Sequence, residues 1–212
     1  DSGGDPRAIP DLTYEQFKRF HDTYYHPSNA LIYFYGDDAP DKRLEFVDTY
    51  LRDFDAIQLD RTIPLQPRFD APIRLAHGYD AGDEEADAKK AQVTINWLLA
   101  DALDTEMTMA LQILSHILIG TPASPLRKAL IDSGIGEDLA GGGLEDQTRQ
   151  LYFSTGLKGI TEVDGDRVEE LILDTLASLV RDGIDPDTIE AALNTIDFRL
   201  REWNTGAFPR GI

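Results

Sequence analysis

The stretch of residues 12–37 constrains the fold of this chain more than any other stretch of the sequence. Thr13, with Gln16 three residues later, matches the capping box that opens an α-helix. Pro27 ends this helix, because a proline biases the residue before it away from helical angles. The unbroken apolar and aromatic run at residues 31–35 then predicts a strand that is covered on both faces.

The first block of the chain, residues 1–61, has too few elements to bury a core. After the expected helix and strand, Pro40 opens a second helix, whose apolar stripe is Leu44, Val47, Leu51 and Phe54. One strand and two helices leave most of these apolar side chains without a partner. We therefore expect this block to pack against the rest of the chain or against sequence upstream of it.

Residues 62–72 hold three prolines and no helical periodicity, which is typical of an extended linker. Alternating apolar residues after this linker predict strands at 73–79, 92–99 and 151–157. Helices are expected at 105–119, from Ser124 to Gly134, at 168–180 and at 185–200, and the glycine-rich run 136–143 is expected to form a flexible hairpin or loop. The helix 105–119 is apolar on nearly every side, so we expect it to be the most buried of these elements. Strands grouped with paired helices predict an α+β fold, an antiparallel sheet with helices packed on one face.

Composition excludes several classes of partner. The net charge of −19, from 39 acidic and 20 basic residues, argues against nucleic acid, because phosphate binding needs clustered Lys and Arg. No apolar run has the length of a membrane span, so no membrane is expected either. The acidic surface either attracts basic peptides or serves only solubility. The absence of cysteine excludes disulfides and thiolate metal sites and fits a reducing compartment, the bacterial cytoplasm or an organelle matrix.

No catalytic or metal-binding residue can be assigned from the sequence. Zinc hydrolysis on a helix needs two histidines at i and i+4 with an acid between them, as in H-x-x-E-H. None of the histidines (His21, His26, His77 and His116) has Glu in that place. We expect His116 to be a hydrogen-bonded core or interface residue and His77 an inward-facing strand residue. The sequence has no G-x-S-x-G elbow for a serine nucleophile, and the acids that end the run GGGLED from Gly141 would repel a phosphate.

Four phrases resemble one protein family in combination. They are residues 12–37, SHILIGTPASPLRKAL from Ser115, GGGLED from Gly141 and NTGAFPRGI at the end. The chain resembles the inverted-motif zinc peptidases of the pitrilysin and insulinase family, and most closely the presequence-protease branch. The H-x-x-E-H motif of that family is not in this chain. Because the chain starts with Asp and ends on sequence typical of the middle of a protein, we interpret it as a fragment.

The resemblance implies a non-catalytic portion of a larger zinc endopeptidase. Such peptidases consist of repeated α+β units that enclose a chamber for short unstructured peptides. Residues 1–61 would close the first, catalytic unit, 62–72 would be a linker, and 73–212 would form most of the second, non-catalytic unit. The helix 105–119 would take the place of the zinc-binding helix.

The resemblance also implies where the chemistry belongs. The zinc ligands and the catalytic Glu would lie upstream of Asp1, and zinc would be a cofactor of the parent protein only. The fragment alone would be inactive. Its partners would be the remaining units and unstructured peptide substrates, and its substrate-binding residues are unknown at this stage. Two alternatives stay open: an inactive relative that serves as a partner subunit, and an unrelated small hydrolase.

Overall fold

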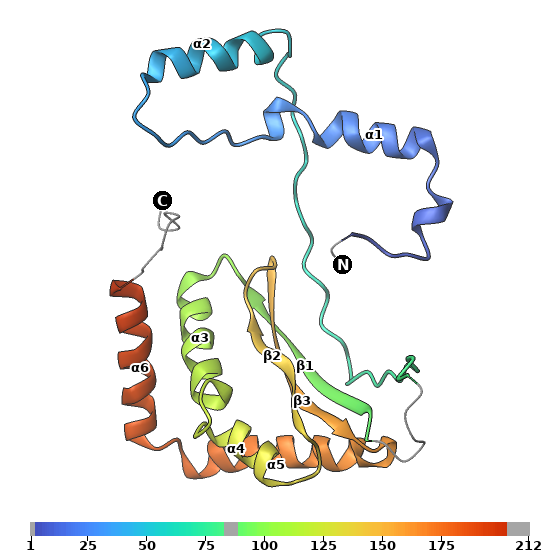
Figure 1. Cartoon of the computed structure of the whole chain (residues 1–212), viewed down its shortest axis with the longest axis vertical. Helices are drawn as coiled ribbons and strands as arrows, with labels where there is room; N and C mark the ends of the chain where they lie inside the picture. Colours follow the sequence, from blue (N-terminus) through green and yellow to red (C-terminus); the bar gives the residue numbers. More distant parts are fainter. Residues whose placement is uncertain (1–2, 83–88, 203–212) are drawn as a thin grey trace. The chain divides into compact units, whose positions relative to one another are not determined.

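The computed structural model describes residues 3–82 and 89–202 (Figure 1). The chain divides into two units, Asp1–Ile63 and Pro64–Ile212, and each is described by itself. The last of the four family-like phrases, residues 204–212, lies outside the described residues, as does most of the acidic stretch after Asp80.

The first unit is helical. Its elements are η1 Ile9–Asp11, α1 Tyr14–Tyr24, η2 Pro27–Asn29 and α2 Pro40–Leu51. The predicted capping box is confirmed: the Gln16 N–H donates to Thr13 Oγ1 at 3.2 Å, and the Thr13 N–H donates to Gln16 Oε1 at 2.7 Å. Local side-chain chemistry therefore places the start of α1.

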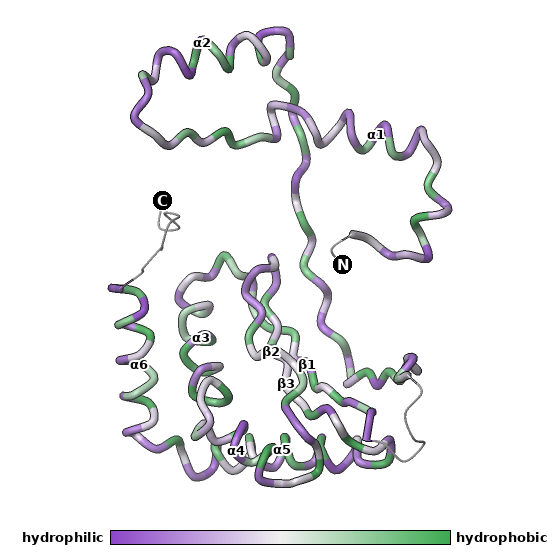
Figure 2. Tube along the Cα trace, viewed as in Figure 1, coloured by the Kyte–Doolittle hydropathy of each residue, from purple (hydrophilic) through white to green (hydrophobic). Residues whose placement is uncertain are grey.

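The strand predicted at residues 31–35 is wrong. These residues are extended, but they pair with no other strand, and the described part of the first unit contains no strand that could pair with them. Leu31 is 96% exposed. The hydrophobic colouring of this segment, which leads into α2, is visible in Figure 2. An apolar run predicts a strand only where a second strand supplies hydrogen bonds, and this unit supplies none.

The second unit is built on an antiparallel sheet of β1 Ala91–Asp101, β2 Asp138–Glu145 and β3 Gln150–Ile160, in the order β1-β3-β2. β3 is the central strand; Trp97 of β1 and Leu144 of β2 both lie opposite Phe153. The strands expected at 92–99 and 151–157 are thus confirmed.

The strand predicted at 73–79 is wrong, because this segment is extended without a strand partner. It is held instead by side chains. The Arg74 guanidinium pairs with Glu169 of helix α5 (Gly165–Asp182), and the Tyr79 hydroxyl donates to the Lys90 carbonyl. His77 is exposed and does not face inward.

Helices cover one face of the sheet. They are α3 Thr105–Ile119, α4 Pro125–Asp132 and α5 Gly165–Asp182, with η3 Glu162–Asp164 before α5; α6 Pro186–Arg201 packs against α3. The core lies between the sheet and α3, α4 and α5; its buried members are Leu118, Leu126, Leu130, Phe153, Leu157, Ile160, Val168 and Ile172. The opposite face of β1 carries the exposed polar residues Gln92, Thr94 and Asn96. The unit has the expected α+β architecture, an antiparallel sheet with helices on one face.

The helix at 105–119 forms as predicted, but its burial was overestimated. Only Ile117 and Leu118 of α3 are buried, and Leu114 is 39% exposed. The most continuous burial lies in β3, which has a neighbour on each edge and helices on one face. An all-round apolar pattern therefore does not distinguish a central helix from one that borders a groove.

The glycine-rich run forms a strand and not a loop. Residues 138–145 are β2, which continues through a tight connection into β3, so the hairpin is right and the flexible loop is wrong. Ala140 lies opposite Gly156 and Gly143 opposite Ser154, so two residues of β2 face one residue of β3. This β-bulge at Gly141 and Gly142 interrupts the regular pairing of the edge strand.

Candidate functional site

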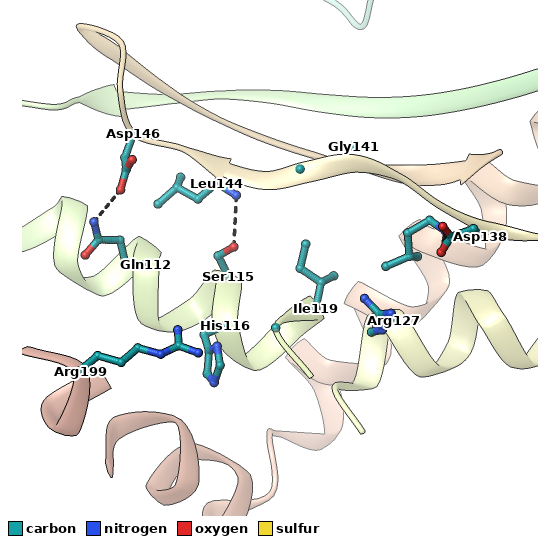
Figure 3. Close-up of a pocket in the computed structure, with 13 residues that line it drawn as sticks. Gln112, Ser115, His116, Ile119, Arg127, Asp138, Gly141, Leu144, Asp146 and Arg199 are labelled. Carbon is teal, nitrogen blue, oxygen red and sulfur yellow. Dashed lines mark hydrogen bonds between the residues drawn. The ribbon is translucent and has the colours of Figure 1, made fainter. Parts of the chain in front are cut away.

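A groove of about 580 Å³ runs beside the edge strand of the second unit. Its lining comes from α3, α4, α6 and the free edge of β2 (Figure 3). The lining residues are Gln112, Ser115, His116, Ile119, Gly120, Arg127, Asp138, Leu139, Gly141, Gly142, Leu144, Asp146 and Arg199. Polar and charged side chains make up most of this surface, and Ile119, Leu139 and Leu144 are its large apolar members.

The free edge of β2 faces α3 across the groove. The Leu144 N–H points away from β3 and donates to Ser115 Oγ on α3 at 3.1 Å. Gly143 permits this close approach, because a Cβ there would lie 2.8 Å from Ile119 Cδ1 and its φ is +79°. Only glycine occupies such a position without strain.

At the other end of β2, the Leu139 N–H donates to Asp138 Oδ1 at 2.8 Å. Asp138 also pairs with Lys158 of β3, at 3.1 Å. The hydrogen bond from Leu139 and then the Lys158 ammonium lower the pKa of Asp138 below 3.8, and Arg127 adds a weaker attraction. The N–H groups of Leu139 and Leu144 are thus satisfied by side chains and not by a neighbouring strand.

A polar contact closes the groove near the β2–β3 turn. Gln112 Nε2 on α3 donates to Asp146 Oδ2 at 2.6 Å (Figure 3). Gln147 Nε2 donates to Asp146 Oδ1 at 3.0 Å. The carboxylate of Asp146 is therefore already occupied by amide donors from the chain itself.

Three basic side chains of the groove, Arg127, His116 and Arg199, make no side-chain hydrogen bond or ion pair with the described residues; of these, Arg127 lies at the Asp138 end, where it attracts that carboxylate. The Arg199 side chain extends from α6 to His116 on α3 (Figure 3). Neither the guanidinium nor the imidazole makes a hydrogen bond or an ion pair among residues 3–82 and 89–202. The core alternative of the His116 prediction is therefore wrong, because this half-buried residue lines the groove, and its interface alternative stays a prediction.

The histidines identified from the sequence do not come together. His21 and His26 belong to the first unit, where the His26 Nδ1 accepts from the Ser28 N–H at 3.1 Å. Within the described ranges, no three His, Cys, Asp or Glu side chains are grouped so that they could hold a metal ion. The residues present do not fit a zinc site, and no step of a reaction is assigned to them.

Sequence reasoning did not identify the groove. Ser115, Gly142 and Arg199 lie on three different elements, and only the fold brings them to one surface. The available signal was the glycine run itself, because glycines inside a strand mark a bulge or a close approach.

The family of the chain follows from comparison with known proteins. Residues 11–196 match the family described as the Peptidase M16 inactive domain, and the chain belongs to this family.

Named relatives cover the whole chain. Over 215 residues and 100% of its length, the chain is 51% identical to presequence protease 1, chloroplastic/mitochondrial, of Arabidopsis thaliana. It is 40% identical, over 94% of its length, to the mitochondrial presequence protease of Mus musculus. In both comparisons it spans 20% of the relative, so the chain corresponds to about a fifth of these proteins.

Solved structures share the fold. An M16-like peptidase from Alicyclobacillus acidocaldarius matches 95% of this chain and 47% of its own, with a TM-score of 0.63 and 21% identity. A protease from Helicobacter pylori matches 95% of this chain and 48% of its own, with a TM-score of 0.64 and 18% identity. In the described part of the chain, no helix is long and apolar enough to cross a membrane.

Proposed function

We propose that this chain is the non-catalytic, peptide-holding portion of a zinc-dependent endopeptidase that degrades short unstructured peptides. The proposal is supported by family membership and by relatives named presequence proteases, which are about five times as long as this chain. The names of these relatives, chloroplastic/mitochondrial and mitochondrial, support an organelle matrix as the compartment in this proposal.

In this proposal the two units belong to different parts of the parent. Residues 1–61 close the first, catalytic unit, 62–72 form the linker, and 73–212 form most of the second unit. The first unit supports this assignment because it buries none of its large apolar side chains, so their partners must lie outside it. In this proposal, zinc, its ligands and the base belong to the remaining units of the parent.

The groove beside β2 is the surface that holds the peptide. An extended peptide can add a strand to a free sheet edge, with main-chain hydrogen bonds for affinity and side-chain pockets for specificity. The single observation that carries this proposal is the Leu144 N–H, which is directed across the groove and bound only by the hydroxyl of Ser115. When α3 moves away from Gly143, a peptide carbonyl can take the place of that hydroxyl, while Ile119, Leu139 and Leu144 receive apolar side chains.

Filling the groove tests this function. A Cβ on Gly142 would meet nothing within 4 Å, and its φ lies outside the left-handed region, so Gly142→Trp places a large side chain in the groove without straining β2. The 212-residue chain should bind a labelled unstructured peptide, measured by fluorescence anisotropy, and Gly142→Trp should weaken binding at least about tenfold, since it removes several apolar contacts.

Gly165→Trp is the matched control, because Gly165 also has open space and begins α5 away from the groove. It should leave binding unchanged. Equal binding by the wild type and Gly142→Trp would contradict a groove along β2. In the full-length parent, Gly142→Trp should raise KM at unchanged zinc content, and a chelator should abolish cleavage. A parent that binds peptides through this groove but neither holds zinc nor cleaves would be the inactive partner subunit instead.

A further inference from the structure

Arginines in this chain are usually neutralised by its many carboxylates. Ion pairs with Asp or Glu engage Arg7, Arg43, Arg52, Arg74, Arg149, Arg167, Arg181 and Arg201. An arginine that lacks such a pair in a chain of net charge −19 is therefore an exception. The described arginines without such a pair are Arg19, Arg61, Arg68, Arg127 and Arg199, and two of them line the groove. Arg127 lies at the Asp138 end and attracts that carboxylate, whereas Arg199 lies beside His116.

The contrast with Arg201 shows that the exception is local. Both arginines lie in the last turn of α6. Arg201 Nε binds the carboxylate of Asp197, one turn earlier on the same helix, at 2.8 Å. The Arg199 side chain leaves α6 in another direction and extends toward His116 of α3 (Figure 3). α6 thus presents one neutralised arginine and one available guanidinium.

His116 completes the arrangement. Its imidazole is half-buried, lines the same groove, and makes no hydrogen bond to the described part of the chain. The carboxylates of the groove are not available to these two groups: Asp146 accepts from Gln112 and Gln147, and Asp138 binds Lys158. A guanidinium and an imidazole that face one space therefore lack an anion.

We infer that Arg199 and His116 form a subsite for a peptide carboxylate at the α3–α6 side of the groove. This inference rests on the proposed peptide-binding function and specifies its substrate class. A guanidinium binds a carboxylate through two parallel N–H donors, and an imidazole N–H supplies a third donor. The bound group is the C-terminal carboxylate of the peptide or an Asp or Glu side chain, held while the backbone lies along β2.

Matched peptides test the subsite in the full 212-residue chain. One pair carries Glu or Gln at a central position, with acetylated N-terminus and amidated C-terminus. A second pair differs only in a free or an amidated C-terminus. We expect the carboxylate member of one pair to bind about 5- to 10-fold more tightly, a modest ratio because Arg199 is solvent-exposed. The pair that shows the preference identifies the source of the carboxylate.

Variants locate the preference. Arg199→Gln should reduce the affinity ratio between the carboxylate and the neutral peptide to about one. The affinity for the neutral peptides should not change. Arg201→Gln, on the same helix with the same loss of charge, should keep the preference. Gly142→Trp should weaken all four peptides. Higher ionic strength should reduce the preference, because screening shortens the reach of the charge to about 8 Å at physiological salt.

The outcomes distinguish the carboxylate subsite from the proposed peptide-binding function of the groove. If all peptides bind the wild type equally and Gly142→Trp weakens them, the groove stands and the carboxylate subsite is wrong. If the preference survives Arg199→Gln, another residue reads the carboxylate, and the assignment is likewise wrong. If no peptide binds the wild type, both the subsite and the proposed function fall.

Discussion

The two units have similar sequence signals and very different burial. In the first unit the capped helix α1 and the apolar run at 31–35 bury no side chain, and Leu31 is 96% exposed. In the second unit, residues of equal hydrophobicity, such as Leu157 and Ile172, are 0% exposed. The difference is a sheet: β3 gives the helices of the second unit a common surface, and the first unit has none in its described residues.

This contrast shows that secondary structure and stability have separate sources. A capping box and a proline position a helix locally, and they do so in the first unit without a core. Most of the free energy that keeps a helix folded comes from packing its apolar face. The first unit therefore has helices whose stabilising partners lie elsewhere, which fits its proposed place at the end of a larger catalytic unit.

Hydrogen exchange should show the largest difference between the units. Amides of β3 are expected to exchange only on global unfolding, at least ~10³-fold more slowly than amides of α1, because the stability of a folded core is several kcal/mol and that of a solvated helix is near zero. Mass spectrometry of the intact 212-residue chain measures both at once. Comparable protection in α1 and β3 would mean that the first unit has a core of its own.

Leucine truncation should give the next largest difference. Leu157→Ala should lower the free energy of unfolding by about 2–5 kcal/mol, because it opens a cavity in a site with 0% exposure. The same change at Leu31 should alter it by less than about 0.5 kcal/mol. Urea denaturation followed by tryptophan fluorescence reports both, since Trp97 packs against the core. Two equal losses would break the contrast between the units.

The smallest difference concerns acid. The guanidinium of Arg149, with the Leu103 N–H, lowers the pKa of Asp101 below its ordinary value of 3.8. A carboxyl whose pKa is lowered by folding stabilises the fold above that ordinary value, and this stabilisation is lost as the pH falls through the lower, folded pKa. Asp101→Asn should therefore lower the stability of the second unit at neutral pH and flatten its decrease below pH 3.8.

The first unit provides the control for this acid effect. Arg43 likewise lowers the pKa of Asp38, yet Asp38→Asn should leave the unfolding of the sheet and its acid dependence unchanged. Denaturation series at several acidic pH values, observed through Trp97, measure both variants. An equal response to the two substitutions would show that the units unfold together.

The sequence predicted what depends on neighbours within a few positions. Thr13 was recognised as an N-cap, and it accepts the expected backbone hydrogen bond. The two wrong strands, at 31–35 and 73–79, have apolar patterns as clear as that of β1. Whether an extended segment becomes a strand depends on a partner that is distant in sequence, and no local pattern contains that information.

The groove was beyond local reasoning for a related reason. The glycines of β2 have low strand propensity, so the sequence predicted a loop at this position. Pairing with β3 makes the segment a strand instead. His116 was expected to find a hydrogen bond inside the core because α3 is apolar on most sides. The burial of a helix face depends on which elements pack against it. Here α6, which is distant in sequence from α3, places Arg199 beside His116.

The bulge in β2 has a consequence for any strand laid against that edge. Leu139 and Leu144 are an odd number of positions apart, so in a regular strand they would point to opposite faces. The extra residue at the bulge shifts the phase, and both leucines pack toward the same core. A ligand strand whose side chains alternate strictly between two faces can match the facing of β2 on only one side of the bulge. To match both sides, the ligand strand needs an extra residue of its own opposite the bulge.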